Sequence, residues 1–254
     1  MNIVKRLMKA RGLSSLIFLI ALFFVVGSIN PAFLTPATIA ACFNTSVVYT
    51  LVAVGVAFTL FIGEIDVSVG SNLGLVAAVV GTMLRDGQPL IAAVVVGIAI
   101  GAAIGLINAW GVAVMKAPSL IFTLGVNGIL RGIIYVYTNG AWVENLPKSF
   151  KDFSAVTGIG DLTVYYCAVI ALVVIIHMVL TKTRRGRWFA AVGDNANGAT
   201  LVGIPTLRTK ILAYVLCGVF AAVGGILFCS RIGFVTPMSG NGYEDEIPTG
   251  LAVS

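Results

Sequence analysis

The sequence predicts an all-α, polytopic integral membrane protein with about seven transmembrane helices and a cytoplasmic N-terminus. The first observation behind this prediction is composition: the 254 residues are 59% hydrophobic and 10% charged, with a mean hydropathy of +1.04. Soluble domains are about 45–50% apolar and about 25% charged. One core cannot hide so much apolar surface, so lipid must be the solvent for much of it.

The second observation is the spacing of the apolar residues, which gather in seven segments. Most of these segments approach the ~20 residues that a helix needs to cross the hydrocarbon layer. Helices are expected because an open sheet would leave unpaired backbone groups in lipid. The segments are 13–29, 46–63, 65–84, 90–115, 118–138, 162–181 and 211–230.

The third observation is the placement of the charges. With the N-terminus in the cytoplasm, connections after even-numbered spans also face inward, and most basic residues then lie inside, as the positive-inside rule requires. The net charge of +6 therefore indicates membrane topology and no nucleic-acid partner. The inward residues are Lys5, Arg6, Lys9, Arg11, Lys116, Lys182, Arg184, Arg185, Arg187, Arg208 and Lys210, and the outward ones are Arg85, Lys148, Lys151 and Arg231.

The first segment follows a basic start and could be mistaken for a signal peptide. Its apolar run is long for the hydrophobic region of a signal peptide, and no A-x-A-like site closes it. We therefore expect an uncleaved first span.

The junction of the second and third segments, "FIGEIDVSVGSNLG" (61–74), interrupts the apolar sequence with charged and polar residues. It carries Glu64 and Asp66 with no Lys or Arg nearby in the sequence, although an acid at a helix centre costs about 2.5–3.5 kcal/mol. A plain cytoplasmic turn would explain both acids. Against this alternative, polar residues and glycines continue into the span, which favours irregular backbone that lines a cavity. The predicted path residues here are Asp66, Ser68, Ser71 and Asn72.

Two later segments also carry patterned residues. Gly97, Gly101 and Gly105 form a ridge of small residues that predicts close helix packing. In 118–138, Thr123, Asn127 and Arg131 recur every four residues and continue to Tyr135, so they share one helix face. Such a stripe faces a bundle interior or a water-filled path, with an Arg131 that snorkels to the outer interface as the alternative.

The inward connection 182–210 is too long for a hairpin turn and too apolar for a solvated linker. Asp194 or Asn195 can cap a short helix that Gly203 and Pro205 terminate. This helix either lies on lipid headgroups or docks into a soluble partner, and its small residues favour the partner.

Three motifs resemble a known family. They are "IDVSVGS" (65–71), "P-x-x-I-x-T-L-G-x-x-x-x-x-R-G" (118–132) and "G-R-x-x-x-A-x-G-x-N-x-x-x-A-x-x-x-G-I" (186–204). In this order they are similar to the membrane permease of bacterial ABC importers for monosaccharides, the group of the ribose, xylose, galactose, rhamnose and autoinducer-2 systems. The stretches "TNGAWVENLP" and "AVGDNANGA" resemble the autoinducer-2 and rhamnose branch.

The resemblance implies a pair of permeases, identical or paralogous, in the bacterial inner membrane. It also implies a sugar-binding protein that delivers the substrate and two cytoplasmic ATPases. Asp66, Ser68 and Asn72 would lie near the path, and 194–204 would be the coupling helix on the ATPase. Many members have Gly in place of Glu64, and Ala in place of Gly198. The coupling residues so implied are Gly193, Asp194, Asn195, Ala199, Gly203 and Ile204.

No Walker-type G-x-x-x-x-G-K-[ST] motif occurs, so ATP hydrolysis is expected from a partner and the chain is not expected to be an enzyme. The four cysteines lack metal-ligand spacing, and no metal or other cofactor is expected. Two other functions stay open: a proton- or ion-coupled secondary transporter that uses Asp66 and Glu64, and a structural or assembly role. The sequence does not name the sugar.

The end of the chain differs from the family pattern. Family members continue past "G-x-G-Y-E" with further spans, whereas here "GNGYEDEIPTGLAVS" ends at Ser254. We therefore expect residues 1–254 to be a single permease domain that is incomplete at its C-terminus, lacking about three spans of a roughly ten-helix fold.

Overall fold

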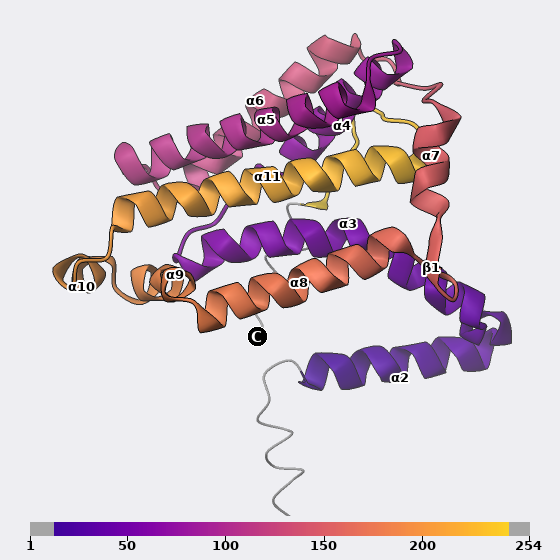
Figure 1. The fold of residues 1–254 in the computed structure, drawn as a ribbon, viewed down its shortest axis with the longest axis horizontal. Coiled ribbons are helices and arrows are strands. Elements are labelled where there is room, and N and C mark those ends of the chain that lie inside the picture. Colours follow the sequence, from indigo (N-terminus) through magenta and orange to yellow (C-terminus); the bar gives the residue numbers. More distant parts are fainter. Residues whose placement is uncertain (1–12, 244–254) are drawn as a thin grey trace, which may run out of the picture.

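The structure, a computed structural model, describes residues 13–243 and is almost entirely helical (Figure 1). Its one sheet in this range is a two-stranded hairpin. The elements in chain order are α2 (Leu13–Ile29), the 3₁₀ turn η1 (Pro31–Leu34), α3 (Pro36–Phe61), α4 (Val69–Arg85), α5 (Leu90–Ala109), the π-helical turn η2 (Trp110–Val114), α6 (Ser119–Thr138), α7 (Lys148–Ala155), β1 (Thr157–Ile159), β2 (Leu162–Thr163), α8 (Val164–Lys182), α9 (Arg184–Asp194), α10 (Ala196–Leu201) and α11 (Thr206–Ile232).

Each of the seven predicted segments is helical, which confirms the all-α membrane fold. Among the described residues, five helices are long and apolar enough to cross a membrane: α3, α5 with η2, α6, α8 and α11. The apolar parts of α2 and α4 are shorter. The third segment begins later than expected, at Val69, because residues 64–67 are not helical.

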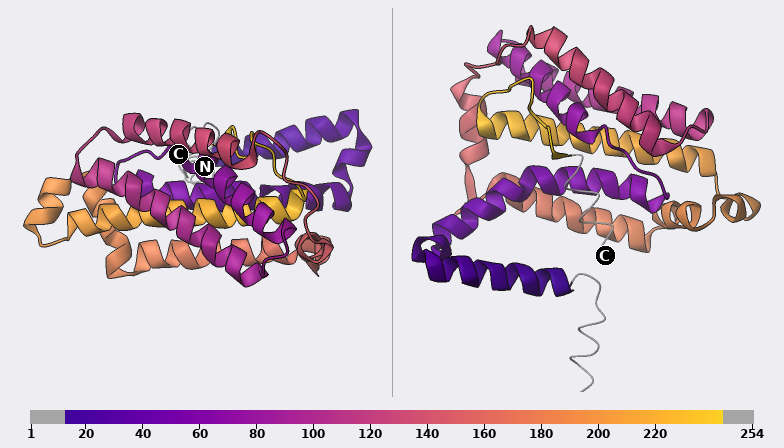
Figure 2. Two further views of the ribbon diagram at one scale, coloured as in Figure 1. Left: turned by 90° about the horizontal axis from the view of Figure 1, so that it is seen from above. Right: turned by 180° about the vertical axis from the view of Figure 1, so that it is seen from behind.

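Helix α11 is the centre of the bundle. It packs against α3, α4 and α5, and two further views show it between a layer of α4, α5 and α6 and a layer of α3 and α8 (Figure 2). Tyr214, Cys217 and Ala221 on α11 are fully buried. Helix α2 lies at the edge of the bundle and packs on η1 (Figures 1 and 2).

The predicted glycine ridge of α5 is a packing face against α11. A Cβ on Gly101 would overlap Ala222 and the backbone of Gly218, and a Cβ on Gly105 would overlap the carbonyl oxygen of Tyr214. The two backbones therefore approach more closely than larger side chains would allow.

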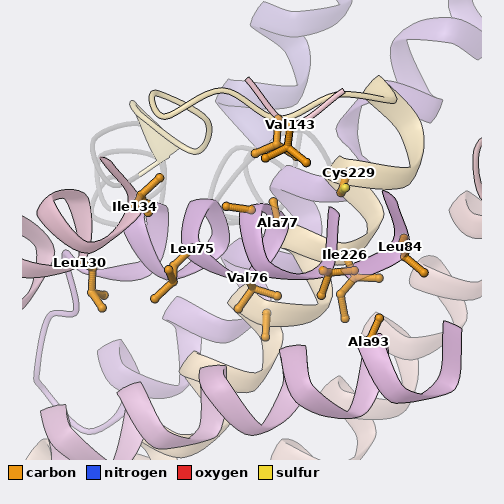
Figure 3. Close-up of a cluster of buried hydrophobic side chains, with 14 of the residues drawn as sticks. Leu75, Val76, Ala77, Leu84, Ala93, Leu130, Ile134, Val143, Ile226 and Cys229 are labelled. Atoms are coloured by element: carbon orange, nitrogen blue, oxygen red, sulfur yellow. The ribbon is translucent and has the colours of Figure 1, made fainter. Parts of the chain in front are cut away.

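Helix α4 is enclosed by protein along most of its length. Figure 3 shows Leu75, Val76 and Ala77 of α4 among side chains of α5, α6 and α11, including Ala93 and Ile226. On its other side, Val69 and Leu73 pack on α3 and α11. A helix with no lipid-facing side can carry polar residues that lipid would not tolerate.

The outward faces of α2, α5, α6 and α8 are apolar. Phe18, Ile91, Val136 and Val174, one from each helix, are all exposed in the isolated chain. Contiguous apolar surface of this kind is rare on soluble monomers and is what a lipid-facing surface requires.

The connection 139–163 covers one end of the bundle. Val143 pairs with Val235 through backbone hydrogen bonds of 2.8 and 2.9 Å. Ser230 Oγ on α11 donates to the carbonyl oxygen of Phe150 on α7 at 2.7 Å. The connection is thus fastened to the end of α11.

The opposite end of the bundle holds the loop after α3, the α5–α6 connection and the α8–α11 connection (Figure 1). These segments include Lys116 and the basic cluster of 182–210. Their shared end agrees with the predicted alternation of inward and outward connections. The predictions on Lys5 to Arg11 and on residues after Tyr243 fall outside the described residues.

We predict that Gly101→Val destabilises the protein by about 1–3 kcal/mol, because the added methyl groups overlap α11. The matched control is Gly128→Val on α6, since a Cβ there meets nothing within 4 Å. Thermal unfolding in detergent measures the difference. Equal melting temperatures for the two variants would contradict the packing described here.

Candidate functional site

A non-helical loop, residues 62–68, joins α3 to α4 and runs from the end of the bundle into its interior, where Asp66 and Ser68 are buried. Gly63 closes the end of α3 with φ +75°, a left-handed conformation that favours glycine. The loop then needs partners for its backbone N–H groups, because each unpaired group buried away from water is costly. Ser119 Oγ accepts from Ile65 N at 3.3 Å, and Thr123 Oγ1 accepts from Val67 N at 3.1 Å. The first turns of α6 thus hold the loop.

Asp66 is the centre of a buried hydrogen-bond network and is 1% exposed. Its Oδ1 accepts from the backbone N and the Oγ of Ser68, at 2.9 and 2.7 Å. Asn108 Nδ2, on α5, lies 3.2 and 3.1 Å from the two carboxylate oxygens and 2.8 Å from Ser68 Oγ. This carboxylate is therefore bound by neutral donors.

The same network extends along the start of α4. Ser71 Oγ donates to the carbonyl oxygen of Ser68 at 2.9 Å, and Asn72 Nδ2 donates to that of Gly218 on α11 at 3.2 Å. The side-chain oxygens of Asn72 and Asn108 are buried and have no hydrogen-bond partner among the described residues. We call Asp66, Ser68, Ser71, Asn72 and Asn108 the polar centre.

Sequence analysis predicted four of these five residues and missed Asn108. Asn108 lies in the apolar segment 90–115, where it stands out as an amide among aliphatic residues. Its isolation in an apolar segment could have indicated a functional contact, since a buried amide in a span needs a partner on another helix.

Glu64 does have a cationic partner, which the local sequence did not indicate. Lys210 Nζ on α11 lies 2.6 Å from Glu64 Oε1, and both side chains are largely buried. The two residues are 146 positions apart, so nothing near Glu64 in the chain could reveal the pair. Glu64 therefore fastens the loop to α11.

The four residues predicted to share one face of α6 do not surround a common site. Thr123 is fully buried beside the loop, whereas Asn127 is half-buried and Tyr135 is exposed. Arg131 Nη1 donates to the carbonyl oxygen of Ser239 at 2.8 Å, so the guanidinium binds the segment after α11. Of the four side chains, Thr123 lies next to the polar centre.

The inward connection forms two helices, α9 and α10, separated at Asn195. Asn195 has an extended backbone and caps α10, accepting from Gly198 N at 2.9 Å, while Asp194 ends α9. Gly203 follows with φ +80°, and Ile204 N donates to the carbonyl oxygen of Ala199 at 3.0 Å. Of the two predicted capping residues, Asn195 is therefore the one used.

Within α9 and α10, two of the predicted coupling residues face the chain itself. Ala199 is buried in a cluster with Phe58 and Val192. A Cβ on Gly193 would overlap the carbonyl oxygen of Phe61, so the end of α9 touches the end of α3.

The C-terminal end of α10 presents two apolar side chains outward, Leu201 in its last position and Val202 directly after it. Leu201 is 89% exposed and Val202 is 76% exposed. A docking partner would meet these two side chains first, and neither was among the coupling residues predicted from the sequence.

Within residues 13–243, no three His, Cys, Asp or Glu side chains gather in one group. The polar centre offers hydroxyls, amides and one carboxylate. Such a set forms hydrogen bonds and provides no activated nucleophile.

Comparison with known proteins identifies related chains. The profile of the family "Branched-chain amino acid transport system / permease component" matches residues 38–253. The autoinducer 2 import system permease protein LsrC of Enterobacter sp. (strain 638) is 39% identical over 241 residues, covering 95% of this chain and 70% of that protein. The LsrC proteins of Klebsiella pneumoniae and Salmonella typhi are 39% and 35% identical, with 95% of this chain covered in each case.

No solved structure matches the chain. The family profile nevertheless covers most of its length, and the relatives align over nearly all of it. The chain therefore belongs to this family of transport-system permease components, and it is a multi-pass protein of the bacterial inner membrane.

Proposed function

We propose that this chain is the permease subunit of an ABC importer for a monosaccharide or a related small polyol, of which autoinducer 2 is the best-supported example. The observation that carries the proposal is the buried polar centre at a break between two helices, in a chain similar to autoinducer 2 import permeases. Substrate sites in transporters are typically built where a helix is interrupted at membrane depth.

The chemistry of the polar centre suits a hydroxyl-rich substrate. Asn72 and Asn108 each hold a buried oxygen that accepts from no described residue. Buried acceptors are normally satisfied, so these two favour a donor that arrives with the substrate or with water. Sugar hydroxyls provide such donors.

The energy for transport would come from a partner ATPase, and the chain itself would not be an enzyme. The partners we propose are two ATPase subunits in the cytoplasm, an extracytoplasmic sugar-binding protein and a second permease subunit. The exposed Leu201 and Val202 support ATPase docking at α10.

A physical link runs from this docking surface to the polar centre. Helix α10 packs on α9 and α11, and Ala199 belongs to the same buried cluster as Phe58 of α3. Gly193, at the end of α9, touches the backbone of Phe61 at the end of α3. The next residues form the loop that carries Asp66. A movement of α9 and α10 would therefore displace the loop directly.

A proton-coupled secondary transporter fits less well. Glu64, one of the two acids that it would use, is paired with Lys210, and Asp66 is bound by Ser68 and Asn108. Neither carboxylate is placed as a free proton carrier.

The proposal is tested by ATPase binding. The chain, in nanodiscs, should bind the ATPase encoded beside its gene and should stimulate ATP hydrolysis when sugar-loaded binding protein is added. A chain that bound no ATPase, but bound its substrate in response to a proton gradient, would be a secondary transporter instead.

Asp66→Ala in the assembled importer should reduce substrate uptake by about fivefold or more, because it removes the acceptor that holds Ser68 and Asn108. A lost buried partner costs about 1–3 kcal/mol, and 1.4 kcal/mol corresponds to about tenfold. Membrane abundance should not fall, since removing an acid eases insertion. Asp86→Ala, at an exposed turn, is the control. Full transport by Asp66→Ala would exclude Asp66 from the mechanism.

Leu201→Ser with Val202→Ser should weaken ATPase binding by tenfold or more, because fully burying a Leu or Val side chain contributes about 1.5–3 kcal/mol and 1.4 kcal/mol corresponds to about tenfold. The control is Val156→Ser with Ile159→Ser, two exposed apolar residues at the opposite end of the bundle. Ala199→Trp should instead lower the melting temperature of the isolated chain, since Ala199 is buried in its own core. Unchanged ATPase affinity in the Leu201 and Val202 variant would place docking elsewhere.

A further inference from the structure

A pocket lies between α9 and α11 at the end of the bundle that holds the basic connections. It has a volume of about 310 Å³. One part of its wall is cationic, with Arg185 from α9 and Arg208 from α11, and the rest is aromatic or apolar except for Thr209. The remaining lining residues are Trp188, Phe189, Pro205, Thr209 and Leu212.

The two arginines are available to an anion. The ion pairs within residues 13–243 join Arg85 to Asp86 and Lys210 to Glu64, so neither pocket arginine is neutralised by an acid there. Arg185 lies in the first turn of α9 and Arg208 in the first turn of α11, where the helix dipoles add positive potential. Two guanidinium groups from different helices can bind one phosphate bidentately.

The apolar side of the pocket includes Leu212, which lies at the surface of the bundle. Leu212 is 47% exposed and stands on α11, which continues into the membrane as a 27-residue helix. Trp188 is half-buried and lines the same pocket as the two arginines. Tryptophan beside arginine near the cytoplasmic end of a span is typical of the headgroup level, and basic pockets between transmembrane helices bind anionic headgroups.

We propose that this pocket binds the phosphate group of an anionic phospholipid from the cytoplasmic leaflet. Arg185 and Arg208 would bind the phosphate, and Leu212 would contact an acyl chain. A soluble anion would give Leu212 no apolar partner. The exposed apolar residues offered to the ATPase, Leu201 at the end of α10 and Val202 directly after it, line no part of this pocket. The bound lipid would hold α9 against α11 and thereby fix the base of the coupling segment.

The test is a lipid titration of the purified full chain in detergent by native mass spectrometry. We compare phosphatidylglycerol, which is anionic, with phosphatidylcholine, which is zwitterionic, and we add inorganic phosphate as the soluble competitor. Each basic residue near a membrane surface contributes about fivefold to the binding of anionic lipid, so Arg185→Gln with Arg208→Gln should raise the Kd for phosphatidylglycerol about 30-fold. The Kd for phosphatidylcholine should not change.

The matched control is Arg184→Gln with Arg187→Gln, which removes the same charge from exposed neighbours that do not line the pocket. It should keep most of the affinity. Arg185→Lys with Arg208→Lys retains the charge and should also keep most of it, which separates lipid binding from misfolding of the Gln variant. Gel filtration and circular dichroism check that each variant is folded.

Three results would overturn the proposal. Equal losses in the pocket and control variants would indicate general attraction to basic residues. Displacement of the lipid by millimolar inorganic phosphate would indicate a site for a soluble anion. Normal lipid binding with lost ATPase binding in the Gln variant would assign the pocket to the ATPase interface.

Discussion

The structure depends on one requirement: residues 65–68 enter the bundle without being helical, so their backbone N–H groups need partners beyond α3, whose carbonyl oxygens serve only residues 62–64. Ser119 and Thr123 of α6 supply two of them, and Asp66 itself supplies a third to Ser68. Lys210 then fixes the loop to α11 through Glu64. Because these partners come from α6 and α11, the loop can exist only after the surrounding bundle is assembled.

Helix α4 is enclosed by protein because its start also carries polar groups that lipid would not accommodate. A helix that starts with Ser68, Ser71 and Asn72 cannot face lipid, so other helices must surround it. Small residues make this possible, since Gly101 and Gly218 bring α5 and α11 into backbone contact. The close packing also brings Asn108 of α5 to the carboxylate of Asp66. The geometry of the polar centre therefore depends on the close packing of α5 and α11 as well as on its own residues.

Much of this arrangement could be predicted from the sequence, and the reasons for the rest are physical. Hydropathy located the seven long apolar helices, because a span must be apolar over a fixed length, but it did not locate the short helices α7, α9 and α10. Local polarity located Asp66 and Asn72. Contacts between distant residues were not accessible: the pair of Glu64 with Lys210 depends on how α11 packs, and so does the inward orientation of Ala199. The face that a six-residue helix turns outward is decided by its neighbours, which is why Leu201 and Val202 were not singled out.

The hydrogen bond from Asn72 to Gly218 has a consequence for biosynthesis. Its two residues are 146 positions apart. At a synthesis rate of ~5–20 residues per second, roughly 7–30 s pass between the emergence of α4 from the ribosome and that of its partner. During this interval a helix with polar residues has no complete shelter from lipid. We therefore expect the nascent chain to wait at the insertion machinery, held by proteins that tolerate polar helices, until α11 arrives and releases it into the bilayer.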